Sequence, residues 1–394
     1  MTELLPVAEA QARLLAGFAP VASETLPIVA AAGRWCAADH HARRTQPARD
    51  LSAMDGYALR FADLPGPWQV IGESAAGRPF DGSVGAGEAV RIFTGAALPD
   101  GTDTVMVQEE AVRDGATLIL DGEGPLRRGG NVRRRGLDFT EGDVLATAGE
   151  RLTPARLAVA ATGGVGHVSV HRRVRVAIAA TGDELVEPSS DAGPEALPES
   201  NRLLLRALLA DLPVEIVDLG ILPDRLGALA DAFATVEADL LVTTGGASVG
   251  DHDLVRPALL GAGATIDFWR VALRPGKPLM AGRRGQMAVL GLPGNPVSAF
   301  VTALLFVKPL IARLGGAANP LPATTHAILG EPLPANGPRT DYMRAGLRDG
   351  RALVAGIQDS SMLLTLARAD CLVVRPPYDP GRAAGDSAEI LMIA

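Results

Sequence analysis

A regular alternation of strand-like and helix-like segments occupies residues 173–319 and constrains the fold of this chain more than any other feature. Short apolar runs occur at 174–180, 214–220, 239–244, 266–272 and 287–292. Apolar residues recur at helical spacing at 201–211, 225–236, 253–262 and from Pro296 onward. Strands that alternate with helices in this way predict a doubly wound, parallel α/β sheet.

The loops that follow the predicted strands point to a binding site. In a sheet of this kind, ligands bind beyond the carboxyl ends of the strands. The loops leaving those ends read TGDEL (181–185), GILPD (220–224), TTGGASVGDHD (243–253), RPGKP (274–278) and GLPGNPVS (291–298). We therefore expect all five loops to converge on one edge of the sheet.

The loops carry two kinds of chemistry. The carboxylates are hard oxygen donors that suit Mg²⁺, and they are Asp183, Glu184, Asp224, Asp251 and Asp253. Glycine-rich backbone exposes N–H groups that suit an oxyanion. Asn295 and Pro296 read as the start of a helix, whose N-terminus also favours an anion. Arg270, Arg274 and Lys277 add positive charge.

Each loop taken alone also fits a simpler role. TGDE is typical of a helix cap with acidic residues in the first turn. Asp251 and Asp253 could also cap the helix that follows them, a role that fits Asp251 better than Asp253, and Lys277 alone is typical of a solvated lysine. The functional interpretation therefore rests on acidic and basic loops sharing one sheet edge.

Several familiar sites are excluded by missing motifs. Gly276-Lys277 is followed by Pro278, so there is no P-loop, and no G-x-G-x-x-G follows a strand. His167 and His171 lie four residues apart in a β-like run without an evident third ligand, so a structural role is favoured over zinc. The net charge of −8 and the absence of a dominant basic tract argue against a nucleic-acid partner.

Composition bears on the compartment. Two cysteines, Cys36 and Cys371, cannot form a disulfide framework, which suits a reducing, cytoplasmic location. The N-terminal segment carries Glu3 and Glu9 and no basic leader. The longest apolar run, Val297–Val307, is too short to span a bilayer, so no membrane association is expected.

The rest of the chain predicts further domains. Residues 46–137 read as short β-runs split by Gly, Pro and Asp, which predicts an inserted β-rich domain. Residues 1–45 and 138–172 flank it as a discontinuous helical linker domain, in which the segment TPARLAVAATGG is expected to pack against the N-terminal helix. Residues 173–319 form the α/β domain and 320–394 a C-terminal β-domain. The expected class is thus α/β plus β, in an elongated multidomain subunit.

The loops also match a known family. SAMDGYA (52–58), IFTGAALP (92–99) and NVRRRGLDFTEGD (131–143) precede the five α/β loops in the family's order. From about residue 5 to the C-terminus, the chain resembles the molybdopterin molybdotransferases, the MoeA and gephyrin E-domain family.

The resemblance implies a reaction and an assembly. The family takes adenylylated molybdopterin and molybdate as substrates and, with Mg²⁺, releases AMP and forms the molybdenum cofactor. Its subunits have four domains and form elongated homodimers, and their α/β domain resembles molybdopterin adenylyltransferase, with which a transient contact is conceivable. The active cleft lies between that domain and the β-rich part of the other subunit.

The resemblance also implies roles for individual residues. Those carried over as catalytic are Asp55, Thr94, Asp138, Glu184, Asp224 and Asp253, of which Glu184, Asp224 and Asp253 would hold Mg²⁺. Those carried over as substrate-binding are Gly245, Gly246, Ser248, Gly250, Arg270, Arg274, Lys277, Pro293, Gly294, Asn295, Pro296, Ser298, Arg344, Ser360 and Ser361. For the two serines the register stays open.

Some points depart from the family or stay undecided. Arg270 and Arg274 stand where the family often has lysine, which keeps the charge and changes its geometry. The arginine cluster 127–135 is interpreted as a solvated basic turn in preference to a substrate contact. A cofactor carrier, a dimeric scaffold and a molybdopterin adenylyltransferase are the alternative functions, and the choice between molybdate and tungstate is open.

Overall fold

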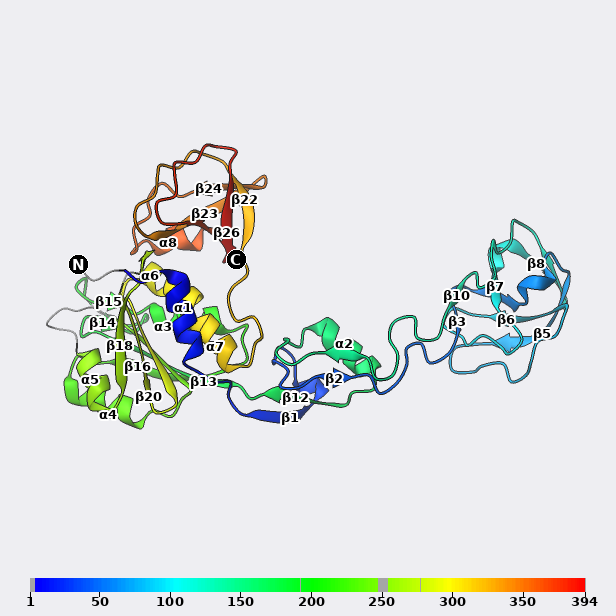
Figure 1. Cartoon of the computed structure of the whole chain (residues 1–394), viewed down its shortest axis with the longest axis horizontal. Coiled ribbons are helices and arrows are strands. Elements are labelled where there is room, and N and C mark those ends of the chain that lie inside the picture. Colours follow the sequence, from blue (N-terminus) through cyan, green and yellow to red (C-terminus); the bar gives the residue numbers. More distant parts are fainter. Residues whose placement is uncertain (1–3, 192, 247–253, 277, 394) are drawn as a thin grey trace.

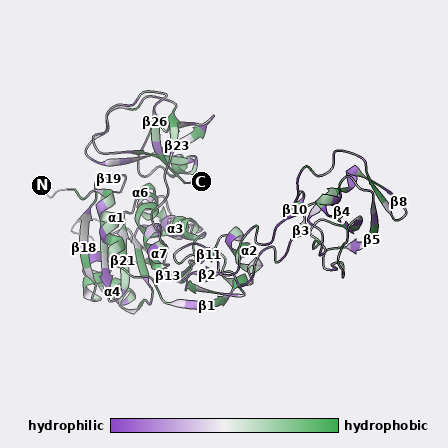
Figure 2. Ribbon diagram, turned by 45° about the vertical axis from the view of Figure 1, so that its right-hand side comes forward, coloured by the Kyte–Doolittle hydropathy of each residue, from purple (hydrophilic) through white to green (hydrophobic). Residues whose placement is uncertain are grey.

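The computed structural model describes residues 4–393 except 192, 247–253 and 277. The chain is elongated (Figure 1), with the α/β domain and the C-terminal domain at one end and the β-rich domain at the other. A linker joins the two ends, and a second view shows the same separation (Figure 2). The boundaries given above are kept as a proposed division of this shape.

The α/β domain is built on a mixed sheet. In the described part of the chain its strand order is β16 (Val214–Leu222), β13 (Val174–Thr181), β17 (Leu240–Thr244), β21 (Met287–Leu292), β20 (Pro278–Arg284) and β18 (Thr265–Arg270). The first four pair in parallel, and β20 pairs antiparallel with both of its neighbours.

The predicted α/β fold is confirmed, but the all-parallel sheet is wrong for one strand. No strand was predicted at residues 278–284, because PLMAGRR lacks a continuous apolar run. In the structure they form β20, which turns back between β18 and β21. Because β20 is antiparallel to both, β18 still runs in the same direction as β21. The loop after β18 therefore still leaves the sheet at the common carboxyl edge.

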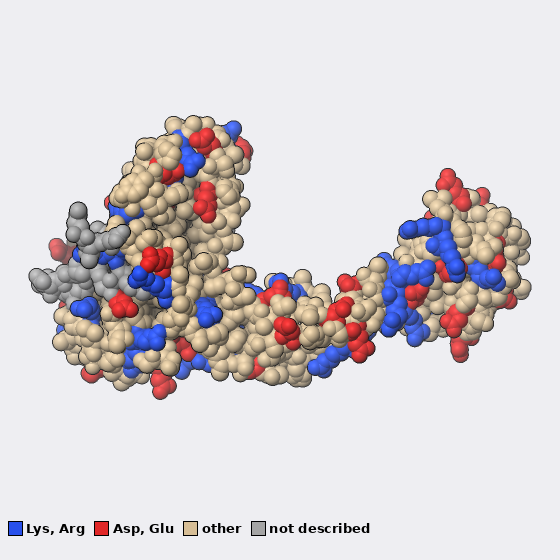
Figure 3. Space-filling model, viewed as in Figure 1, with Lys and Arg blue, Asp and Glu red and all other residues tan. Residues whose placement is uncertain are grey.

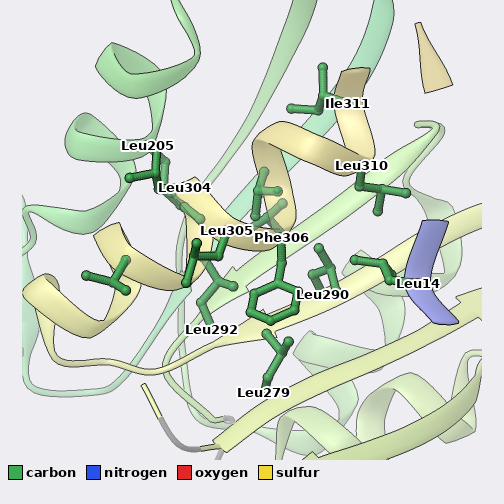
Figure 4. Packing of buried hydrophobic residues seen from close by; sticks show 14 of the residues in the cluster. Leu14, Leu205, Leu279, Leu290, Leu292, Leu304, Leu305, Phe306, Leu310 and Ile311 are labelled. Carbon is green, nitrogen blue, oxygen red and sulfur yellow. The ribbon is translucent and has the colours of Figure 1, made fainter. Parts of the chain in front are cut away.

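Helices cover both faces of the sheet, as expected for a doubly wound fold. One face packs against α1 (Val7–Ala16), α3 (Asn201–Leu209), α6 (Pro296–Thr302), the π-helical turn η4 (Ala303–Val307) and α7 (Lys308–Leu314). The other packs against α4 (Leu226–Thr235) and α5 (Val255–Gly261). Figure 4 shows Phe306 of η4 among Leu279 and Leu290 of the sheet. This aliphatic core holds the strand ends in place.

The segment Pro296–Leu314 is longer as a helix than its apolar run suggested. It spans 19 residues with a mean hydropathy of 1.8, so by length and composition alone it could cross a membrane, contrary to the expectation from Val297–Val307. However, 83% of it is buried inside the structure, where it packs on the sheet. It is the core helix of the α/β domain.

The linker has its own small core. Strand β1 (Ser23–Pro27) pairs with β12 (His167–His171), and β2 (His40–His41) pairs with β11 (Val144–Ala146). Helix α2 (Pro154–Thr162) packs on β11 and on the 3-10 turn η1 (Ile28–Ala30). The expected packing of α2 against the N-terminal helix is wrong, because α1 packs on the α/β domain through Val7, Ala10 and Leu14.

The β-rich domain is a sheet with the order β7 (Thr104–Val107), β4 (Gly56–Leu59), β6 (Glu88–Ile92), β5 (Trp68–Ser74), β9 (Thr117–Leu120) and β8 (Ala111–Asp114). The chain enters and leaves it through β3 (Leu51–Ser52) and β10 (Val132–Arg133), which pair with each other. A bridge between Gln46 and Phe139 marks the same neck. In sequence, the domain is therefore inserted between two segments of the linker.

The C-terminal domain closes on itself. Around the ring run β23 (Thr340–Arg348), β24 (Arg351–Val354), β22 (Thr325–Leu329), β26 (Ser387–Met392) and β25 (Cys371–Arg375), and β25 pairs back to β23. The short β19 (Leu273–Arg274), which follows β18, also pairs with β23. Helix α8 (Leu363–Ala367) contacts α6 (Figure 1). The C-terminal domain is thus attached at the carboxyl edge of the sheet.

Candidate active site

A cavity of about 830 Å³ lies at the carboxyl edge of the α/β sheet. Many of the residues expected at a binding site line it, namely Glu184, Gly245, Gly246, Pro293, Gly294, Asn295, Pro296, Ser298 and Ser361. They come from the loops after β13, β17 and β21 and from the C-terminal domain. The convergence expected from the parallel topology is therefore present for these loops.

A glycine allows the loops to approach this closely. Gly245 has a φ of +87°, and a Cβ there would lie 2.6 Å from the carbonyl oxygen of Thr181, which no side chain could tolerate. Gly294 lies beside it, since its Cβ would be 3.7 Å from the Cα of Gly245. The first, third and fifth loops therefore meet backbone to backbone.

The wall of the cavity includes residues that sequence reasoning missed. Asn201, at the start of α3, lines the cavity, and its Nδ2 donates to the carbonyl oxygen of Gly294 at 2.8 Å. Its Oδ1 and the hydroxyl of Thr244 are buried and have no hydrogen-bond partner within the described structure. Thr244 ends β17 and directly precedes the glycines, and this position was the feature of the sequence that could have placed it at the cavity.

The carboxylate of Glu199 caps the N-terminus of helix α3. It accepts from the backbone N–H of Asn201 at 2.7 Å and of Arg202 at 3.0 Å. The side chain is buried and also pairs with the guanidinium of Arg202. This cap fixes the first turn of the helix, and with it Asn201, against the cavity.

An acidic cluster lies beside the cavity. The backbone N–H of Asp224 donates to Oδ1 of Asp183 at 3.1 Å. Burial, followed by the negative charges of Asp183 and Glu184, raises the pKa of Asp224 above its ordinary value. Carboxylates that repel one another in this way fit a divalent cation with oxygen ligands.

The metal site is not complete in the described part of the chain. Asp251 and Asp253 lie outside the described residues, and no group of three or more His, Cys, Asp or Glu side chains within the described ranges could hold a metal ion. Glu184 and Asp224 are close enough to interact. They are thus the described part of the predicted ligand set.

Replacing Asp224 by asparagine should raise the melting temperature when Mg²⁺ is absent. A carboxyl whose folded pKa is raised loses stability as pH rises from about 3.8 through that pKa, because the unfolded state then binds fewer protons. The asparagine removes this penalty at pH 7.5. Melting curves should also show Mg²⁺ stabilising the wild type more than the variant. Equal stabilisation of both would remove Asp224 from the cation site.

The basic residues predicted for the site lie in different surroundings. Arg274 pairs with the buried Asp341 of the C-terminal domain. Arg270 is exposed at the end of β18. Arg344 is only 1% exposed and lines a separate cavity of about 370 Å³. The predicted residues Lys277, Ser248 and Gly250 lie outside the described residues.

The C-terminal domain meets the start of α6 through two serines. Asn295 does not cap its own helix with its side chain, because Nδ2 donates instead to the hydroxyl of Ser360 at 3.0 Å. The carbonyl oxygen of Ser360 accepts from the backbone N–H of Val297 at 3.1 Å. Ser361 lines the cavity. Both serines of the open register therefore lie at this junction.

A second cluster lies in the β-rich domain. Oδ1 of Asp55 accepts from the backbone N–H of Thr94 at 2.7 Å and from its hydroxyl at 2.9 Å. These bonds, the backbone one first, lower the pKa of Asp55. Asp138 is exposed near the neck, where its N–H donates to the carbonyl of Gln46. In one subunit this cluster lies at the opposite end of the molecule from the 830 Å³ cavity (Figures 1 and 2).

The arginine cluster 127–135 surrounds the neck, where Figure 3 shows positive charge gathered. Arg128 pairs with Asp103 at 2.7 Å and Arg134 with Asp50 at 2.6 Å, and both arginines are at least half exposed. These local partners favour the interpretation as a solvated basic turn.

Comparison with known proteins gives the family. Three family models match in order, the MoeA N-terminal region (domain I and II) at residues 5–164, a probable molybdopterin binding domain at 177–313 and the MoeA C-terminal region (domain IV) at 326–393. A Haemophilus influenzae protein named molybdopterin molybdenumtransferase is 37% identical, over 94% of this chain and 94% of its own length. The chain belongs to the MoeA family.

Other relatives agree along the whole chain. Proteins of the same name from Nostoc sp. and Bacillus subtilis are 34% and 33% identical and align over 94% and 90% of this chain and 89% and 85% of their own length. A crystal structure described as the molybdopterin biosynthesis moeA protein from Pyrococcus horikoshii OT3 superposes with a TM-score of 0.85 at 28% identity, covering 99% of this chain and 100% of that one. The resemblance to the MoeA family is therefore confirmed, and with it the multidomain fold.

Proposed function

We propose that this protein is a molybdopterin molybdenumtransferase that inserts molybdate into adenylylated molybdopterin and releases AMP. The observation that carries the proposal is the end-to-end similarity to relatives of that name. The 830 Å³ cavity supports it, because its glycine backbone suits the phosphates of an adenylylated pterin.

Two groups of residues would divide the work, namely those that line the cavity and the basic residues predicted for molybdate. Backbone N–H groups around Gly245 and Gly294 would receive the phosphates, and Asn201 and Thr244 offer buried polar atoms at the wall. Arg274, Lys277 and Arg344 would hold molybdate, a tetrahedral dianion. No protein nucleophile is required, so catalysis would come from positioning and charge stabilisation.

Mg²⁺ is proposed beside the carboxylates. Glu184, Asp224 and Asp253 would hold it, and the mutual repulsion seen at Asp224 supports this donor set. When bound, the ion would supply positive charge against the pyrophosphate. Because Glu184 lines the cavity, an ion held by these carboxylates would lie at the edge of the cavity.

A homodimer is proposed because the β-rich domain, which carries Asp55 and Thr94, lies at the opposite end of the subunit from the α/β domain and its cavity (Figure 1). A second copy could bring its β-rich domain to the cavity, and each of two equivalent clefts would then contain groups from both chains. The elongated shape supports this arrangement. A cytoplasmic location and a transient contact with the adenylyltransferase remain further proposals.

The test of the function is a comparison of two reactions. One sample receives adenylylated molybdopterin, molybdate and Mg²⁺, and the other receives molybdopterin and ATP. Formation of AMP and molybdenum cofactor in the first supports the proposal. Adenylylation in the second would indicate the adenylyltransferase, and binding without turnover in either would indicate a carrier.

Lys277→Ala should weaken the use of molybdate by roughly ten- to a hundredfold, because a charge-assisted hydrogen bond contributes about 1.5–3 kcal/mol. The measurement is the molybdate concentration needed for half-maximal AMP release. The matched control is Lys308→Ala, since Lys308 pairs with Asp211 away from the cavity. A Lys277 variant with wild-type molybdate dependence would remove this residue from the site.

A further inference from the structure

Gln358 occupies the centre of the loop between β24 and α8. Its Oε1 accepts from the backbone N–H of Arg344 at 3.0 Å and from Nε of the same residue at 3.2 Å. Its Nε2 donates to the carbonyl oxygen of Arg344 at 3.1 Å and to that of Ala355 at 2.8 Å. The amide thus uses both acceptor positions and both N–H donors, three of them on Arg344.

Arg344 depends on this arrangement because its charge is buried. The side chain is 1% exposed, and its other contacts are the carbonyl oxygens of Met362 at 3.2 Å and Ile357 at 3.4 Å. Burial lowers its pKa, and Asp359 partly offsets this. A guanidinium carries five N–H groups, and these contacts engage one on each nitrogen. The second N–H on each terminal nitrogen takes part in none of these contacts.

The same loop forms the C-terminal side of the candidate site. Two residues after Gln358, Ser360 bonds to Asn295 and to the first turn of α6. The next residue, Ser361, lines the 830 Å³ cavity, and its hydroxyl and N–H both donate to Asp359. A change at Gln358 would therefore reach the guanidinium and both serines together.

We propose that Gln358 is a positioning residue for oxyanion binding, which sets the direction of the Arg344 guanidinium and the register of Ser360 and Ser361. This inference rests on the proposed use of molybdate by the protein. Gln358 acts through the groups that it holds and does not itself touch the oxyanion.

The test replaces Gln358 by methionine, which has a similar length and none of the four hydrogen bonds. The expected result is a rise of about tenfold in the molybdate KM, larger than the change in the KM for adenylylated molybdopterin, with kcat at saturating molybdate unchanged. Gln358→Asn keeps the amide on a shorter arm and should give an intermediate KM. A second readout needs no turnover, since molybdate alone should raise the melting temperature of the wild type more than that of Gln358→Met.

The matched control is Asn336→Leu in the same domain. The Asn336 amide also holds loop backbone, donating to the carbonyl oxygens of Arg339, Arg375 and Pro376, but it lines neither cavity. Its variant should lose stability and keep its molybdate KM. An unchanged molybdate KM in Gln358→Met, or an equal rise in Asn336→Leu, would overturn the inference. A wild type that does not use molybdate would instead count against the proposed function.

Discussion

Replacing Asp224 by alanine should reduce the rate of AMP release by at least about a hundredfold while leaving pterin binding largely intact. Asp224 lies beside Asp183 and Glu184, and the two negative charges raise its pKa in addition to burial. Removing it takes one oxygen donor from the proposed cation site, whereas the glycine loops that would receive the substrate stay in place. AMP release is followed by chromatography, and pterin binding by fluorescence titration.

The control for this experiment is Asp231→Ala. Asp231 is an exposed carboxylate on α4 and does not line the cavity, so the variant has the same change in charge and should keep wild-type activity. A normal yield of AMP from the Asp224 variant would count against the metal assignment. Equal losses in both variants would point to net charge in place of a local site.

Mixing two inactive variants should restore activity if the active cleft is shared between subunits. Asp55→Ala removes a residue of the β-rich domain and Asp224→Ala one of the α/β domain, and these lie at opposite ends of one subunit. In a randomly mixed dimer population, half the dimers contain one copy of each variant, and one of their two clefts is intact. Activity should therefore recover from near zero to about a quarter of the wild-type value.

A second mixture serves as the control. Glu184→Ala and Asp224→Ala both alter the same domain, so every cleft in a mixed dimer keeps one defect and activity should stay near zero. Failure of the Asp55 and Asp224 variants to complement each other, in a sample shown by native mass spectrometry to contain mixed dimers, would contradict the shared cleft. Complementation by both mixtures would contradict it as well.

The local pattern of the sequence was sufficient to predict the α/β fold and which loops leave the carboxyl edge. Apolar periodicity is set by neighbouring residues, and parallel topology then dictates where each loop emerges. The glycines after β17 and β21 could be placed at the cavity on this basis. Strand β20 was missed because its sequence lacks that pattern. It forms a strand through its pairing with β18, which a local pattern does not reveal.

What the sequence by itself determined was therefore the order of elements, the family and the edge at which binding groups gather. Only the tertiary structure decided that Asn201 bonds to Gly294, that Asn295 reaches Ser360, and that Arg274 is held by Asp341. It also placed the β-rich domain, which carries Asp55 and Thr94, at the opposite end of the chain from the α/β domain and its cavity. The three contacts join residues that are 65 to 93 positions apart, and no local period specifies the partner of a side chain at such separations.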